Sequence, residues 1–334
     1  MFGYFRFILA FLVLISHLNI SLYGFSLGVF AVVPFYMLAG YVVSKLLTSV
    51  LVSEKSRYLS FYTDRTLRIL PLYYYVVLIS SLFIIFSGYG NPEFSFGKIL
   101  RNLTIIPLNY YFIIDNAILT NPKWWLVPTA WSLAVELQIY LILPFLIFHK
   151  KLRIFAAIFS CFLFSIACFG IIHTDLFGYR LFPGILFIFI IGGFIFEVGN
   201  SKNGPGKFEK TFPGLACLFL SVILIILFVI KKASVPYVRE TILGVIFGFL
   251  TIRILDRSNI KLPGNQLLGD LSYGVFLSHF LAIWVLDKYS IIIQNEHPIK
   301  YVLSVFSISL IISLLGTTIV ESKIKKFRTV RDRN

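Results

Sequence analysis

Three ionisable side chains stand within long apolar stretches of this sequence: His17, Glu136 and His279. Arg6 precedes His17 by eleven residues, and only apolar residues and Ser16 lie between them. On an α-helix these two side chains share one face, about 16 Å apart along the axis. An ionisable group within a membrane is costly and indicates function. The alternative is a histidine that is hydrogen-bonded inside a helix bundle, and this segment alone supports both interpretations.

Other polar residues accompany these groups. Ser132, Glu136 and Tyr140 are spaced i, i+4 and i+8, which predicts one polar stripe on an apolar helix. Ser272 lies seven residues before His279 and so shares its face. For each serine and for Tyr140, interhelical hydrogen bonding is the simpler interpretation. Counted from the predicted membrane edges, the three ionisable groups lie at similar depths, and this favours a shared polar cavity.

Two arginines precede another apolar stretch. Arg65 and Arg68 are three residues apart, so they point the same way and form a fork suited to phosphate. Arg6 is expected at the same membrane edge. The pattern predicts a donor whose charged part stays at the inner surface while its reactive end reaches into the membrane. The alternative is that these arginines only set the topology.

Long apolar helices must position these residues. Hydrophobic residues make up 58% of the 334 residues and charged residues 13%, which predicts an all-α, polytopic membrane protein. We expect one transmembrane domain over 1–334. Cys161, Cys168 and Cys217 lie in apolar runs without metal-ligand spacing, so we expect packing roles and no metal. Ten spans are expected, at about 5–24, 27–48, 69–88, 128–148, 152–172, 181–199, 212–230, 236–254, 268–287 and 299–319.

The basic residues predict the orientation. With the N-terminus inside, 21 of the 30 lysines and arginines fall in inner loops and ends, as the positive-inside rule requires. Both termini are therefore expected inside, and the net charge of +15 needs no nucleic acid to explain it.

The first apolar run lacks a small-residue cleavage site and is expected to be retained as a helix. The longest outer connection, 89–127, is expected to contain a short amphipathic helix (Phe96 to Ile106) and the aromatic segment Lys123 to Trp125, which is expected at the headgroup interface.

Several motifs in this order resemble the membrane-bound acyltransferase 3 family. Arg6 and His17 match its arginine, ten residues, histidine signature. The other similar segments are Arg65-Thr-Leu-Arg68-Ile-Leu-Pro71, Trp131-Ser132-Leu-Ala-Val-Glu136 with Tyr140 and Pro144, and Leu268-Gly-Asp-Leu-Ser272-Tyr273 with Leu277 and His279. Two segments depart from the family pattern. Val33 to Tyr41 lacks its acidic residue and serine-glycine-phenylalanine, and Glu321 has no nearby proline, so Ala39 and Glu321 are left out of the expected site.

The resemblance implies acyl transfer, usually of acetyl from acetyl-CoA, to a hydroxyl of a carbohydrate or other envelope molecule such as O-antigen, capsule or exopolysaccharide. It implies an enzyme of the cell (inner) membrane that uses acyl-CoA as substrate and holds no permanent cofactor. The extra soluble domain of some relatives is not found here, so transfer is expected to be completed by the membrane unit or a partner.

The expected mechanism follows from these residues. His17 acts as general base on the acceptor hydroxyl, and Glu136 orients or stabilises a polar partner or acts as a second acid or base. A covalent acyl-histidine is an open variant. Donor and substrate binding is assigned to Arg6, Arg65, Arg68, Trp131, Ser132, Tyr140, Ser272 and His279. A transporter or flippase of a lipid-linked sugar and a non-catalytic envelope assembly subunit are the alternatives.

Overall fold

The computed structural model describes residues 1–18, 24–200, 206–232, 235–258 and 260–328. The chain forms two compact units, each built from separated segments. The first unit contains Met1, Ile20–Phe61 and Val135–Lys261, and the second contains Phe2–Asn19, Tyr62–Ala134 and Leu262–Asn334. Each unit is described by itself below.

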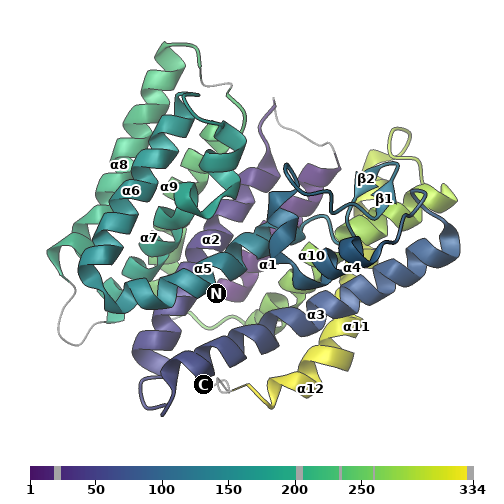
Figure 1. Cartoon of the computed structure of the whole chain (residues 1–334), viewed down its shortest axis with the longest axis horizontal. Coiled ribbons are helices and arrows are strands. Elements are labelled where there is room, and N and C mark those ends of the chain that lie inside the picture. Colours follow the sequence, from purple (N-terminus) through teal and green to yellow (C-terminus); the bar gives the residue numbers. More distant parts are fainter. Residues whose placement is uncertain (19–23, 201–205, 233–234, 259, 329–334) are drawn as a thin grey trace. The chain divides into compact units, whose positions relative to one another are not determined.

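The fold is helical, as predicted (Figure 1). Among the described residues, eight helices are long and apolar enough to cross a membrane. Helices occupy all ten predicted positions, but α1 has only 16 residues and α9 carries Arg239, Glu240 and Arg253. The principal helices are α1 (Phe2–His17), α2 (Leu27–Lys45), α3 (Arg57–Ser87), α4 (Phe96–Thr104), α5 (Ala130–Phe148), α6 (Lys150–Cys168), α7 (Phe182–Asn200), α8 (Lys207–Val229), α9 (Val238–Arg257), α10 (Asn265–Tyr289), α11 (Pro298–Gly316) and α12 (Ser322–Lys325). Single π-helical turns, η1 (Leu46–Val50), η3 (Leu176–Arg180) and η4 (Thr317–Glu321), extend α2, precede α7 and follow α11.

The first predicted span differs from the observed helix. The span was expected over 5–24, whereas α1 begins at Phe2 and ends at His17, so His17 lies in the last turn rather than mid-helix. Residues 19–23 of that span, together with Lys202, Arg331 and Arg333 from the orientation count, lie outside the described residues. The sequence interpretation followed hydropathy, which does not mark where a helix ends.

In the first unit, α2 is the central helix and packs against α7 and α9. Glycines allow the backbones of α2 and α7 to touch. A Cβ atom at Gly40 would lie 1.8 Å from the carbonyl oxygen of Phe189, and one at Gly192 would lie 1.8 Å from that of Met37. Such small-residue contacts are typical of membrane helices, which gain little from hydrophobic burial against each other and pack by close approach.

Charged side chains join the predicted inner ends of these helices. Arg153 of α6, only 5% exposed, donates two hydrogen bonds to Glu197 of α7, at 2.6 and 3.0 Å. Ser44 of α2 donates to the same carboxylate at 2.9 Å, and Glu209 of α8 lies 3.6 Å from Arg153. Because a buried charge is costly unless it is paired, this network holds the four helices together at one end.

In the second unit, α10 lies between α1 and α11. At one end the Gly3 amide donates to the Asn265 side chain at 2.9 Å, and fourteen residues further along both helices His17 bonds to His279. The two helices therefore run parallel and in register over about 21 Å. On the other side of α10, a Cβ atom at Gly274 would lie 2.2 Å from the hydroxyl oxygen of Ser313, so α11 also packs closely.

The predicted outer connection folds over α3 in the second unit. It contains α4, the 3-10 turn η2 (Ile106–Tyr110) and the antiparallel strands β1 (Leu119–Thr120) and β2 (Lys123–Trp124). The expected amphipathic helix is confirmed as α4, which ends at Thr104. Buried Asn102 organises the connection, because its side chain bonds to the backbones of Lys98, Asn116 and Leu126 at 2.9 Å each. On the surface, a hydrogen bond from Lys123 lowers the pKa of Asp115.

Candidate active site

The second unit brings two predicted site residues into direct contact. Nε2 of His279 lies 3.0 Å from Nδ1 of His17, with the ring centroids 5.1 Å apart and the ring planes inclined by only 23°, so the two imidazoles meet edge to edge. His279 is completely buried, and its Nδ1 lies 3.2 Å from the carbonyl oxygen of Val275, one turn earlier in α10. His17 is exposed. One imidazole is thus fixed in the helix packing, while the other is accessible to a reactant.

Aromatic rings surround this histidine pair. The Phe280 ring lies 4.8 Å from the ring of His17 and 5.1 Å from that of His279, measured between centroids. Trp124 of β2 lies 5.3 Å from Phe280, so the outer connection packs against the same group. Trp125 is buried, with 7% exposed. Both tryptophans thus pack against protein, and the position of this segment at the headgroup interface stays a prediction.

The residue just before α5 also contacts α10 within the second unit. Thr129 donates its hydroxyl to the carbonyl oxygen of Phe276 at 3.0 Å. The hydroxyls of Ser132 and Ser272 bond within their own segments, to the carbonyl oxygens of Thr129 and Gly269, three residues back. Both serines are buried. Their expected interhelical bonds are therefore replaced by local ones, while Trp131 beside Ser132 is partly exposed.

Glu136 and Tyr140 belong to the first unit, and they contact each other as their spacing predicts. The Tyr140 hydroxyl donates a short hydrogen bond to a Glu136 carboxylate oxygen. Tyr36 on α2 is also buried, and its hydroxyl has no hydrogen-bond partner among the described residues. Glu136 is therefore bonded to a tyrosine hydroxyl within an otherwise apolar stretch of helix.

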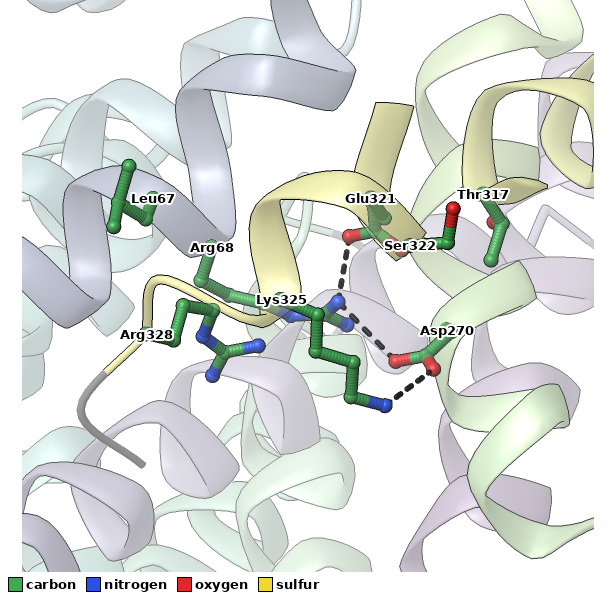
Figure 2. Close-up of a pocket in the computed structure, with 8 residues that line it drawn as sticks. All are labelled: Leu67, Arg68, Asp270, Thr317, Glu321, Ser322, Lys325 and Arg328. Carbon is green, nitrogen blue, oxygen red and sulfur yellow. Dashed lines mark hydrogen bonds and ion pairs between the residues drawn. The ribbon is translucent and has the colours of Figure 1, made fainter. Parts of the chain in front are cut away.

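A pocket of about 120 Å³ lies at the predicted inner end of the second unit (Figure 2). Arg68 of α3 reaches its centre and donates to Glu321 at 2.7 Å and to Asp270 at 3.2 Å. Lys325 of α12 lies 3.5 Å from the second oxygen of Asp270, and Arg328 also faces the pocket. Three segments distant in sequence, from α3, α10 and the η4–α12 region, thus meet around one guanidinium group.

The two arginines of the predicted phosphate fork bind separate carboxylates. Arg65 pairs with its neighbour Asp64, which is completely buried and also accepts a hydrogen bond from Arg328 at 3.1 Å. Arg68 pairs with Asp270 and Glu321. These residues form one charged cluster. Its cations are Arg65, Arg68, Lys325 and Arg328, and its carboxylates are those of Asp64, Asp270 and Glu321, so the cluster carries one net positive charge. Arg6 is partly buried on α1, eleven residues before His17.

Sequence reasoning missed part of this cluster. In the sequence, Lys325 and Arg328 count only as basic residues of the inner C-terminal end, Asp270 appears only within the Leu268–Tyr273 motif, and Asp64 has no distinguishing signal. Glu321 was set aside because its segment departs from the family pattern, although it accepts the shortest hydrogen bond of Arg68. A single acidic residue next to a run of basic residues does not by itself indicate a binding site. Only the folded structure, which places Glu321 opposite Arg68, shows its role.

The fold and the motif residues define a class, a multi-pass membrane protein with accessible polar groups among apolar helices. Comparison with known proteins identifies its family. A family model described as an acyltransferase domain matches residues 2–318. The chain therefore belongs to the acyltransferase 3 family and is a membrane acyltransferase, so the resemblance drawn from its motifs is confirmed.

One relative from the curated proteins is an uncharacterized protein of Aquifex aeolicus (strain VF5). It is 35% identical over 210 residues, which cover 63% of this chain and 92% of that protein. No solved structure matches this chain.

Proposed function

We propose that this acyltransferase moves an acetyl group from acetyl-CoA, bound from the cytoplasmic side, to a hydroxyl of a cell-envelope carbohydrate. It acts in the cytoplasmic (inner) membrane. The observation that supports this most strongly is the exposed imidazole of His17, hydrogen-bonded to buried His279 in a chain of the acyltransferase 3 family. A base of this kind is what an alcohol needs in order to attack a thioester near neutral pH.

His17 acts as general base in the proposed reaction. It takes the proton of the acceptor hydroxyl while that oxygen attacks the thioester carbonyl carbon. The carbon–sulfur bond then breaks, and the protonated imidazole returns the proton to the leaving thiolate. The products are the acetyl ester and free CoA thiol, and the histidine ends in its starting state. Neither an oxidant nor a metal ion is required for this balance.

Glu136 serves a second role in the proposal. Its carboxylate accepts a hydrogen bond from the Tyr140 hydroxyl, so this pair presents groups that can hydrogen-bond to the hydroxyls of a carbohydrate acceptor. We assign Glu136 to orienting or stabilising a polar reactant, with Trp131, Ser132, Tyr140 and Ser272 contributing to substrate binding or to its support.

The donor's phosphates are assigned to the pocket around Arg68. The cluster of four cations and three carboxylates carries one net positive charge, and Lys325 is the least buried of the basic side chains that line the pocket. A phosphate would compete with Asp270 and Glu321 for these cations, so donor binding and the position of α12 are expected to be coupled. Arg6 and Arg65 contribute positive charge on α1 and α3.

The proposed function is tested by following both products. Purified protein in lipid vesicles is mixed with acetyl-CoA labelled in the acetyl group and with surface polysaccharide extracted from the producing cells. We expect label on the polysaccharide and an equal amount of free CoA thiol. Transport of a lipid-linked sugar would produce neither product. Thiol release without labelled polysaccharide would reject the carbohydrate acceptor, and absence of both would reject the proposed reaction.

A further inference from the structure

The hydrogen bonds of His279 determine which of its ring nitrogens carries the proton. A carbonyl oxygen can only accept, so the contact with Val275 requires Nδ1 of His279 to be the donor. His279 is completely buried, and burial favours the neutral ring, which has a single N–H group. Its Nε2 must then be an acceptor. Since that atom lies 3.0 Å from Nδ1 of His17, the proton between the two rings belongs to His17.

From this arrangement we infer that His279 is a positioning residue that fixes the tautomer of His17, with the proton on Nδ1 and the basic lone pair on Nε2. The second nitrogen of a neutral histidine is the acceptor whenever the first is the donor. Two hydrogen bonds therefore run in the same direction, from Nδ1–H of His17 to Nε2 of His279 and from Nδ1–H of His279 to the carbonyl oxygen of Val275. This inference rests on the proposed function, because the lone pair matters only if His17 is the base.

The hydrogen bond between His17 and His279 also has a role during the reaction. When Nε2 of His17 takes the hydroxyl proton, the ring becomes an imidazolium, and its Nδ1–H continues to donate to His279. The acceptor nitrogen then faces a positive charge, which strengthens the bond. His279 keeps its own proton on Nδ1 throughout, because the Val275 carbonyl holds it. His279 thus orients the base and stabilises its charged form, but it does not touch the substrate.

The surrounding packing keeps His279 in place. Its ring is flanked by Phe276 and Phe280, at centroid distances of 6.5 and 5.1 Å. The parallel register of α1 and α10, set at the other end by Gly3 and Asn265, brings the two histidines to the same level. A side chain of the wrong length at position 279 would therefore leave Nδ1–H of His17 without this acceptor, although the helices remained packed.

Two substitutions that differ by one methylene group test the inference. The amide of His279→Gln reaches about as far as Nε2 of histidine and can accept from His17. The amide of His279→Asn reaches only as far as Nδ1, so it can bond to Val275 but not to His17. In membranes with matched protein levels, and with labelled acetyl-CoA as the varied substrate, we expect His279→Gln to keep kcat within about fivefold of wild type. His279→Asn is expected to lower kcat about 10- to 100-fold with KM for acetyl-CoA unchanged.

The outcomes separate this inference from the proposed function. If His17→Ala retains activity, the proposed function fails. If His17→Ala is inactive while His279→Asn is normal, or if His279→Gln and His279→Asn lose activity equally, only the role of His279 is wrong. Should the variants fold poorly, nitrogen-15 NMR of labelled histidine in the wild-type protein decides, with His17 assigned by its loss in His17→Ala. A protonated Nδ1 on His17 supports the inference, and a protonated Nε2 overturns it.

Discussion

Arg68 joins two separate segments of the second unit through its ion pairs. Its guanidinium is held between Glu321 and Asp270, which come from η4 and α10, while its neighbour Arg65 is held by Asp64. Removing Arg68 would leave two carboxylates facing each other, so its loss would disturb folding as well as donor binding. Lys325 offers a cleaner probe, because it lines the same pocket but is about one-third exposed.

Lys325→Gln is expected to raise KM for acetyl-CoA about fivefold with kcat unchanged. The reason is that one partly exposed charge contributes about 1 kcal/mol, which corresponds to that change in affinity. Lys323→Gln is the matched control, since it removes the same charge from α12 at an exposed position that does not line the pocket. Steady-state kinetics of labelled acetyl transfer give both constants. An equal change in KM for the two variants would reject a phosphate site in this pocket.

At the residue scale, much of the candidate site followed from sequence. The sequence marks His17 and His279 as ionisable residues within apolar stretches, and the structure brings them into contact. The spacing of Glu136 and Tyr140 also led to an observed hydrogen bond. The contacts of Phe280 and the carboxylate partners of Arg68 could not be predicted. A phenylalanine in an apolar run, or an acidic residue near a helix end, looks the same in the sequence whether or not a distant segment packs against it. Glu321 is the clearest case.

At the element scale, the pairing of α1 with α10 positions the histidines. Two parallel helices in register keep His17 opposite His279 only while their other ends remain close, and Gly3 makes that approach possible. Sequence patterns located these helices well, because long apolar stretches admit few other structures in a membrane. They could not show which helices pair. They also overestimated the first span, because residues 18–24 continue the apolar run beyond the end of α1.

Gly3→Ala is expected to destabilise the protein and lower acyl transfer. A Cβ atom at Gly3 would lie 1.6 Å from the carbonyl oxygen of Asn265, so the two helices must separate, at a cost of about 1–3 kcal/mol. Gly214→Ala in α8 is the control, because a Cβ atom there meets nothing within 4 Å and alanine favours a helix. Thermal unfolding in detergent compares the two. A melting temperature as high for Gly3→Ala as for Gly214→Ala would contradict the proposed pairing.

At the scale of the whole molecule, the polytopic helical fold is established, whereas the orientation and the single domain remain predictions. The distribution of basic residues places both termini inside, and the donor pocket would then face the cytoplasm, where acyl-CoA is made. The native cysteines are all buried, at 8%, 0% and 9% exposed, so they give little background for labelling an introduced cysteine.

Introduced cysteines test the orientation directly. Glu296 and Lys323 are both exposed, and the prediction places them on opposite sides of the membrane. In intact cells, a membrane-impermeant maleimide should label Glu296→Cys but not Lys323→Cys, and permeabilised cells should show labelling of both. The reverse pattern in intact cells would place the Arg68 pocket on the outer side and exclude its assignment to cytoplasmic acyl-CoA.

The central claim is that His17 is the base of acyl transfer, and the most direct measurement compares His17→Ala with His297→Ala. Both substitutions remove an exposed histidine from the second unit, but His297 lies at the start of α11, where its side chain makes no capping bond. With labelled acetyl-CoA and extracted surface polysaccharide, kcat for His17→Ala should fall at least about 100-fold. His297→Ala should match wild type. Near-normal kcat for folded His17→Ala would contradict the account.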